Sequence, residues 1–397
     1  MSNKKNKVSL NPIMTLMILI VVTIVLSGVL ALFGVGASYD TIKNSTYESN
    51  WVAVESLFNL RGIKYIFQST VSNFAAFTPL SMLIIILIGI GIMDKSGFLK
   101  TTFSLITRKC QKKTLTFVLA LICIILSIGG DLAYVVMIPL SALLFYYGRR
   151  NPLLGIVISF AALTCGTGLS FFKTSIDSSL DALTLESSRI LDSSYTFTYL
   201  GYFIIMVVAI LAIAALITYI SERFSVNELP KYEFKDDKKD FKLAKRDIRG
   251  LIFAGTFGII YLLIFIYNII PGLPLSGNLL DYSQKLYIDK LFNPDSFFSQ
   301  GFVFIVTILF VILGLFYGLG SRSIKNSNDF CDYLTHSLDG IGRTIILILL
   351  SSILVNVFKK SNIGTVITAL IGNLITNCKF TGIPLLVLFF IGTAVAT

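Results

Sequence analysis

Two aspartates are candidates for chemistry, because each interrupts or ends an apolar run. Asp131 lies in the middle of an apolar stretch, directly after two glycines, and Asp177 lies where a second apolar stretch ends. A carboxylate at membrane depth is costly and is by default a candidate for function. A carboxylate beside hydroxyl groups can bind a cation or relay a proton. We therefore expect both aspartates to bind an ion or a substrate.

The residues around Asp131 favour a break in a helix. Gly129 and Gly130 permit a sharp turn and a close approach of the backbone to a ligand. The half-helix ends at such a break present free N–H and C=O groups. Alternatively, Asp131 only caps the helix that follows. Tyr134, one helical turn later, either faces the same cavity or packs, and Pro139 is predicted to kink the helix.

The residues around Asp177 are polar and end a predicted membrane helix. Thr174 and Ser175 supply hydroxyl groups close to the carboxylate, and Lys173 is near enough to pair with it. Together these groups could bind a cation, a proton or a substrate. The alternative is an ordinary polar loop at the membrane face, in which Lys173 neutralises Asp177.

Other classes of site find little support in the sequence. Five cysteines form no Cys-x-x-Cys pair, and the single histidine, His336, lies in a polar stretch. No nucleotide-binding motif is present, so we predict no cofactor and no metal. An intramembrane enzyme would have to build its catalytic pair from Asp131 and Asp177. The net charge of +11 comes from Lys and Arg clusters between apolar runs, which is typical of cytoplasmic loops and not of nucleic-acid binding.

Composition places these residues in an all-α, polytopic membrane protein. The chain has 397 residues, of which 55% are hydrophobic and 14% are charged, against about 25% charged in soluble domains. Several apolar runs reach about 18 residues or more, the length that a helix needs to cross a bilayer. They must form helices, because lipid offers the backbone no hydrogen-bond partners.

The stretch around Asp131 is predicted to be a re-entrant hairpin, residues 114–148. Lysines precede it and arginines follow it, so both ends belong on the cytoplasmic side. Each leg has about 14 residues, or roughly 21 Å of helix, which is shorter than a hydrocarbon core of about 30 Å. The tip would therefore lie near the middle of the membrane, where irregular backbone needs protein or water around it.

The charge pattern also divides the chain. We expect an N-terminal span with an external segment (1–75), a first repeat (76–221), a cytoplasmic linker (222–250) and a second repeat (251–397). Lysines at the start of the chain predict a cytoplasmic N-terminus and a multi-pass protein of the plasma membrane.

An internal repeat supports this division. Residues 93–98 and 358–363 each place a Lys-Ser turn between a span and an amphipathic segment. The first copy follows an inward crossing and the second an outward crossing, so the repeats are predicted to be inverted, as in secondary transporters. Lys359 and Lys360 would then lie outside, against the charge rule. The alternative is a chance similarity of apolar sequences.

The chain resembles the AbgT family of p-aminobenzoyl-glutamate transporters nearly from end to end. The motifs that carry the resemblance are residues 10–12, 72–74 with Pro79, 94–97, 130–140, 317–320 and 381–386. The resemblance implies a homodimer whose protomers have nine spans and two re-entrant hairpins. It also implies that an ion gradient, of Na⁺ or protons, drives import of p-aminobenzoyl-glutamate or export of sulfonamide-like antimetabolites.

The resemblance also bears on individual residues. The family's Gly-Thr-Asp-Pro motif falls on residues 175–178, of which only Asp177 is kept, and an upstream Asn falls on Ser170. A second hairpin is expected to begin at Thr381 and to continue past Thr397. The sequence would then be truncated, and an inactive remnant is an alternative to an ion-coupled transporter. A channel is a third possibility.

Overall fold

The computed structural model describes residues 11–43, 46–169, 199–230, 232–234, 243–293, 295–378, 382–396 and a few positions between 181 and 196. The chain forms two compact units. One comprises Met1–Leu80 and Gly340–Thr397, and the other comprises Ser81–Asp339. These units follow spatial contacts and do not divide at the linker 222–250, so the predicted repeat boundaries stay a prediction.

The architecture is that of a polytopic helical membrane protein, as predicted. Within the described residues, seven helical stretches are long and apolar enough to cross a bilayer. Shorter apolar helices accompany them, which is the pattern expected of re-entrant legs. The seven stretches are Pro12–Leu32, Leu60–Ser96, Lys112–Gly129, Leu200–Glu228, Lys245–Ile269, Phe297–Ser321 and Gly342–Lys360.

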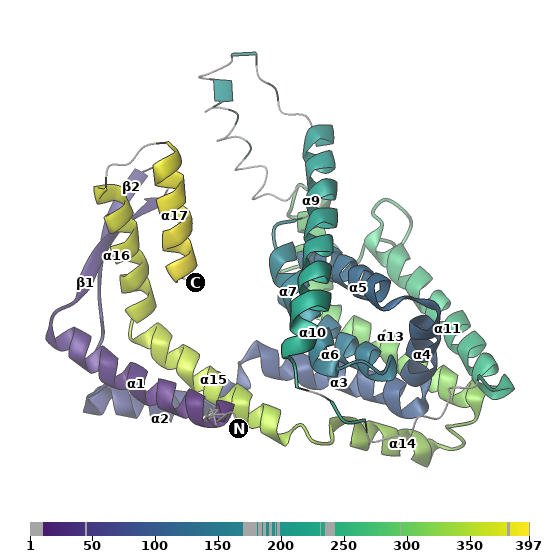
Figure 1. The fold of residues 1–397 in the computed structure, drawn as a ribbon. Coiled ribbons are helices and arrows are strands. Elements are labelled where there is room, and N and C mark those ends of the chain that lie inside the picture. The colour runs from purple at the N-terminus through teal and green to yellow at the C-terminus, as the bar shows by residue number, and fades with distance from the viewer. Residues whose placement is uncertain are drawn as a thin grey trace, which may run out of the picture. The chain divides into compact units, whose positions relative to one another are not determined.

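The first unit combines helices with a small sheet (Figure 1). The strands β1 and β2 pair as an antiparallel hairpin on which α16 packs, and the side-chain amide of Asn373 donates to the Ser38 carbonyl over 2.9 Å. Neither this sheet nor helix α2 was expected in the external segment predicted within residues 1–75. The elements are α1 (Pro12–Leu32), β1 (Gly36–Lys43), β2 (Thr46–Ala53), α2 (Leu60–Ala75), α15 (Gly342–Lys360), α16 (Ile363–Asn377) and α17 (Ile383–Ala396).

The second unit is a helical bundle around one large apolar core. Helices α11 and α13 pack closely: a Cβ on Gly320 would lie 2.8 Å from the Gly250 Cα, and Phe257 stacks on Phe316 at 3.6 Å. Small residues allow such approach of membrane helices. The elements are α3 (Thr78–Ser96), α4 (Phe98–Lys109), α5 (Lys112–Leu126), α6 (Asp131–Tyr147), α7 (Pro152–Gly166), α9 (Tyr199–Ile220), α10 (Val226–Glu228), α11 (Lys245–Ile269), α12 (Tyr287–Phe292), α13 (Phe297–Ser321) and α14 (Ser327–Thr335).

The two predicted copies of the repeat share their local structure. Helix α3 ends at Ser96 and α15 ends just before Ser361, and each serine hydroxyl donates to the carbonyl three residues earlier. The next residue has a left-handed backbone in both copies, Gly97 with φ 92° and Asn362 with φ 57°. Glycine and asparagine tolerate this conformation. An amphipathic helix, α4 or α16, then begins in each copy.

Candidate functional site

The chain breaks where the sequence predicted. Helix α5 ends at Leu126, a single 3₁₀ turn covers Ser127–Gly129, and α6 begins at Asp131. Gly130 joins them with φ 55° and ψ −133°, and its N–H donates to the Ser127 carbonyl over 2.9 Å. A residue with a side chain would be strained in this conformation. The two legs are therefore separate helices joined by a tight turn.

The outer ends of the two legs lie together. The guanidinium of Arg150, which follows α6, donates to the carbonyl of Lys112, the first residue of α5, over 3.1 Å. The chain thus enters and leaves the hairpin at one place. Helices α5 and α6 have 15 and 17 residues, about 22 and 25 Å of helix, against a hydrocarbon core of about 30 Å. With the 3₁₀ turn that continues α5, however, the first leg reaches the 18 residues of Lys112–Gly129, which are long enough to cross. The meeting of the two outer ends is therefore what supports the predicted re-entrant hairpin, and leg length does not decide it.

The tip of the hairpin lies against the end of α7. A Cβ on Gly166 would lie 2.7 Å from the Ser127 hydroxyl and 2.9 Å from the Ile124 Cα. Beyond Gly166 the backbone turns through Gly168, which has φ 89°, and the Leu169 N–H donates to the Gly166 carbonyl over 2.8 Å. The contact brings the tip next to the chain that leads into residues 170–177.

The candidates around Asp131 gather at the tip, where Asp131 itself is exposed. Tyr134 is half-buried, and its hydroxyl lies 3.0 Å from the Thr164 hydroxyl. Its ring meets Phe160 edge to face at 5.9 Å. These contacts attach Tyr134 to α7, as expected of a packing role.

The remaining candidates are four residues after α7 and Pro139 within α6. Ser170, Thr174, Ser175 and Asp177 lie outside the described residues, so their roles stay predictions. Helix α6 continues through Pro139 from Asp131 to Tyr147. Proline removes one backbone donor there.

One aromatic residue at the tip was missed. Phe292 ends α12, and a Cβ on Gly129 would lie 3.9 Å from its ring. Its ring also meets Phe298 edge to face at 5.3 Å. In the sequence Phe292 is one of 32 phenylalanines, and no local pattern connects it with Gly129.

The whole sequence matches a known family. The model of the AbgT putative transporter family covers residues 4–397. The chain belongs to the AbgT family. The AbgT-family chain is 22% identical, over 379 residues, to the p-aminobenzoyl-glutamate transport protein of Escherichia coli (strain K12). That match covers 96% of this chain and 72% of the relative.

Solved structures show the same fold as this AbgT-family chain. The Alcanivorax borkumensis YdaH transporter, described as having an unusual topology, matches with a TM-score of 0.55 and 22% identity over 97% of this chain and 78% of that one. Neisseria gonorrhoeae MtrF, described among antimetabolite efflux pumps, matches with a TM-score of 0.54 and 25% identity over 95% of this chain and 74% of that one.

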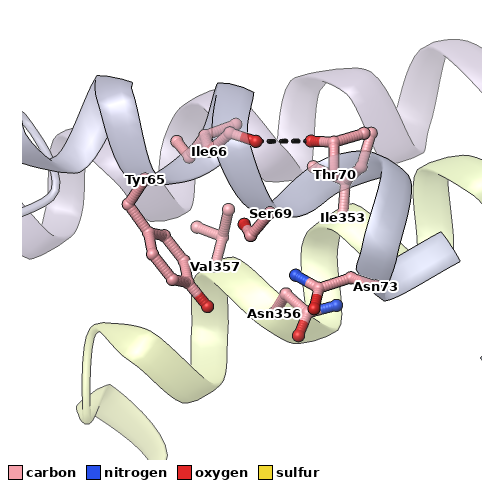
Figure 2. A pocket seen from close by; sticks show the side chains of 8 residues that line it. All are labelled: Tyr65, Ile66, Ser69, Thr70, Asn73, Ile353, Asn356 and Val357. Atoms are coloured by element: carbon pink, nitrogen blue, oxygen red, sulfur yellow. Dashed lines mark hydrogen bonds between the residues drawn. The ribbon is translucent and has the colours of Figure 1, made fainter. Parts of the chain in front are cut away.

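A small pocket lies within the first unit, between α2 and α15 (Figure 2). It is a small, partly open pocket. Figure 2 shows the side-chain amides of Asn73 and Asn356 close to each other at one end. Its lining mixes polar and apolar side chains, and none of the lining side chains is charged. It is lined by Tyr65, Ile66, Ser69, Thr70, Asn73, Ile353, Asn356 and Val357.

Proposed function

We propose that this AbgT-family protein is an ion-coupled secondary transporter of p-aminobenzoyl-glutamate or a related aromatic, anionic metabolite, including sulfonamide-type drugs. Family membership and the E. coli relative support the class of substrate. The likeness to MtrF supports efflux of antimetabolites as one form of the activity. A single geometric observation supports the mechanism, namely the break at Gly130 with the tip held against α7.

The break supplies the groups that such a substrate needs. The start of a helix carries a partial positive charge, which at the start of α6 favours a carboxylate. The end of α5 presents carbonyl groups, which favour a cation. We propose that substrate binds between the tip, residues 129–134, and residues 174–177. Asp177 would be the carboxylate that couples to the ion or contacts the substrate.

Aromatic side chains near the tip suit an aromatic substrate. Phe292 approaches Gly129, and Phe160 on α7 has 55% of its surface exposed beside Tyr134. Aromatic rings attract one another in offset or edge-to-face arrangements. We propose that Phe292 and Phe160 contact the benzoyl ring, while Tyr134 holds the second leg of the hairpin against α7.

The coupling ion is proposed to be Na⁺ or a proton, since both can use a carboxylate with hydroxyl neighbours. The protein is proposed to work as a homodimer in the plasma membrane, with its N-terminus in the cytoplasm. Alternating access would move the body that carries the hairpin against a dimer scaffold.

The experiment measures uptake of radiolabelled p-aminobenzoyl-glutamate and resistance to sulfonamides in cells that express the chain. A chimera that adds the unmatched part of the E. coli relative is tested in parallel. We expect saturable uptake, abolished by collapse of the ion gradient and by Asp131→Asn or Asp177→Asn. Asp295→Asn, an exposed carboxylate in another loop, should leave uptake unchanged.

Each alternative predicts a different result. Unsaturated current that follows the voltage across planar bilayers would favour a channel. Cleaved substrate inside the cells would favour an enzyme. Activity of the chimera without activity of the chain would support the inactive remnant. Unimpaired uptake in both aspartate variants would contradict the proposed site.

A further inference from the structure

A buried ion pair joins the open end of the hairpin to α9. The Arg150 guanidinium lies 2.6 Å from a Glu222 carboxylate oxygen, and their side chains are only 9% and 14% exposed. The same guanidinium donates to the Thr116 hydroxyl over 2.9 Å and lies 4.5 Å from the centre of the Phe145 ring. The Thr116 hydroxyl also donates to Glu222.

Each partner comes from a different segment. Thr116 lies in the first turns of α5, Arg150 follows α6, and Glu222 lies in the π-helical turn Ser221–Ser225 that extends α9. Burying two charged groups costs considerable desolvation free energy, which their attraction offsets only if further hydrogen bonds satisfy both groups. Here the carboxylate accepts from two side chains, and the guanidinium reaches three oxygen atoms counting the Lys112 carbonyl. A network with several shared hydrogen bonds favours one fixed geometry.

A second set of contacts ties the same two parts together. After α10 the chain returns to the end of α6, where the Asn151 side-chain amide donates to the Pro230 carbonyl over 2.8 Å. The Tyr146 ring lies 6.2 Å from Tyr232 and 5.8 Å from Phe234. The start of the linker therefore docks on the hairpin independently of the ion pair.

We propose that Arg150 and Glu222 are positioning residues that lock both legs of the hairpin to α9, so that these elements move as one body during transport. This inference rests on the proposed function. The lock lies at the open end of the hairpin, and the length of α5, about 22 Å, separates it from the tip. It therefore acts on the placement of the site and makes no contact with the substrate.

The first test uses a double-mutant cycle. Arg150→Gln and Glu222→Gln each leave one buried charge unpaired, so each should lower the maximal uptake rate about tenfold and lower the melting temperature. KM should stay unchanged, because the substrate binds at the tip. The double variant removes both charges and should recover most of both losses. Lys113→Gln, an exposed cation in the first turn of α5, is the matched control and should have no effect.

The second test asks whether the parts move relative to each other. In a cysteine-free background, Asn151→Cys and Pro230→Cys are joined by a short, reducible thiol cross-linker, which leaves the ion pair intact. If these elements move as one body, the protein should take up substrate equally well while cross-linked and after the cross-link is reduced. Uptake that is lost on cross-linking and regained on reduction would overturn the inference, as would a double variant no better than the worse single variant.

The outcomes separate this inference from the proposed function. Absence of uptake by the unmodified protein and by the chimera would refute the proposed function alone. The melting temperatures of the four members of the cycle would still measure the coupling between Arg150 and Glu222. Additive changes in melting temperature would then refute the lock.

Discussion

At the scale of single residues, Gly166 is the position where the site depends most directly on the absence of a side chain. A Cβ there would meet the hydroxyl of Ser127 at 2.7 Å and backbone of α5 at 2.9 Å. The backbone cannot yield as a flexible side chain would. The hairpin tip and the end of α7 can therefore approach this closely only because residue 166 is glycine.

Replacing Gly166 with alanine should displace the tip from α7. Overpacking of this kind costs roughly 1–3 kcal/mol, and the substrate site should lose its geometry. We expect a lower melting temperature and at least a large fall in uptake. Gly201→Ala in α9 is the matched control, because nothing lies within 4 Å of a Cβ at that position. Equal melting temperatures and equal uptake in the two variants would contradict the contact between Gly166 and the hairpin tip.

Asp281, in the loop before α12, should make the stability of the fold depend on pH. Hydrogen bonds from the Ser283 backbone and hydroxyl and from the Asn293 amide lower the pKa of the Asp281 carboxyl below its usual 3.8. A carboxylate with a lowered folded-state pKa stabilises the fold above its unfolded pKa, and this contribution is lost as pH falls through the folded value. The loop should therefore loosen only below about pH 4.

The measurement compares the melting temperatures of the wild type and Asp281→Asn across pH. The difference should be constant near pH 6 and should shrink to nothing as acid protonates the wild-type carboxyl. Asp295→Asn, an exposed carboxylate between α12 and α13, is the matched control. A difference that grows in acid would have the wrong sign for a lowered pKa.

At the scale of elements, the hairpin depends on where its ends lie. The bond from Arg150 to the Lys112 carbonyl brings the start of α5 and the chain after α6 together. Both ends must then face the same side of the membrane, whichever side that is. The lysines and arginines at these ends predict the cytoplasm.

Labelling with a membrane-impermeant maleimide tests this placement. In a cysteine-free background, Lys113→Cys and Arg149→Cys should both react in inside-out vesicles and neither in intact cells. Lys285→Cys lies in the loop between α11 and α12. Because α11 follows the predicted cytoplasmic linker, this loop is expected outside, and Lys285→Cys should show the opposite pattern. If residues 113 and 149 react from opposite sides, the re-entrant hairpin and the placement of the substrate beside its tip are both wrong.

At the scale of the whole molecule, the repeat predicts opposite sides for two similar turns. Ser96 with Gly97 and Ser361 with Asn362 have the same hydrogen bond and the same left-handed backbone. The lysines of the second copy would lie outside, whereas Lys and Arg are usually enriched on the cytoplasmic side. The Lys360 ammonium, however, lies 2.8 Å from the Glu55 carboxylate. Pairing reduces the net positive charge that an external turn would expose.

Lys100→Cys and Lys359→Cys should therefore be labelled from opposite faces of the membrane. Both side chains are exposed, so accessibility within the protein does not limit the reaction. Position 100 should react from the cytoplasm and position 359 from outside. Labelling of both positions from one side would contradict an inverted repeat and would leave the shared turns as a local similarity.

Much of the fold could be predicted because the bilayer imposes simple local rules. A span needs a continuous apolar run, and a break needs a residue that tolerates a left-handed backbone. Both signals lie within a few neighbouring residues. The small sheet at residues 36–53 was missed because it sits between the spans, where the bilayer imposes no such rule on strand pairing.

The sequence by itself determined the helical membrane class, the break at Gly130 and the family, whereas the sheet at residues 36–53 and helix α2 were not expected. Only the tertiary structure decided which distant residues meet: Gly166 with Ser127, Gly129 with Phe292, and Arg150 with Glu222, which lies 72 residues further along the chain. The physical reason is that a local pattern reports the solvent around a segment, whereas a contact depends on how helices pack. Packing is specified by the whole set of side chains at an interface and by no short stretch alone.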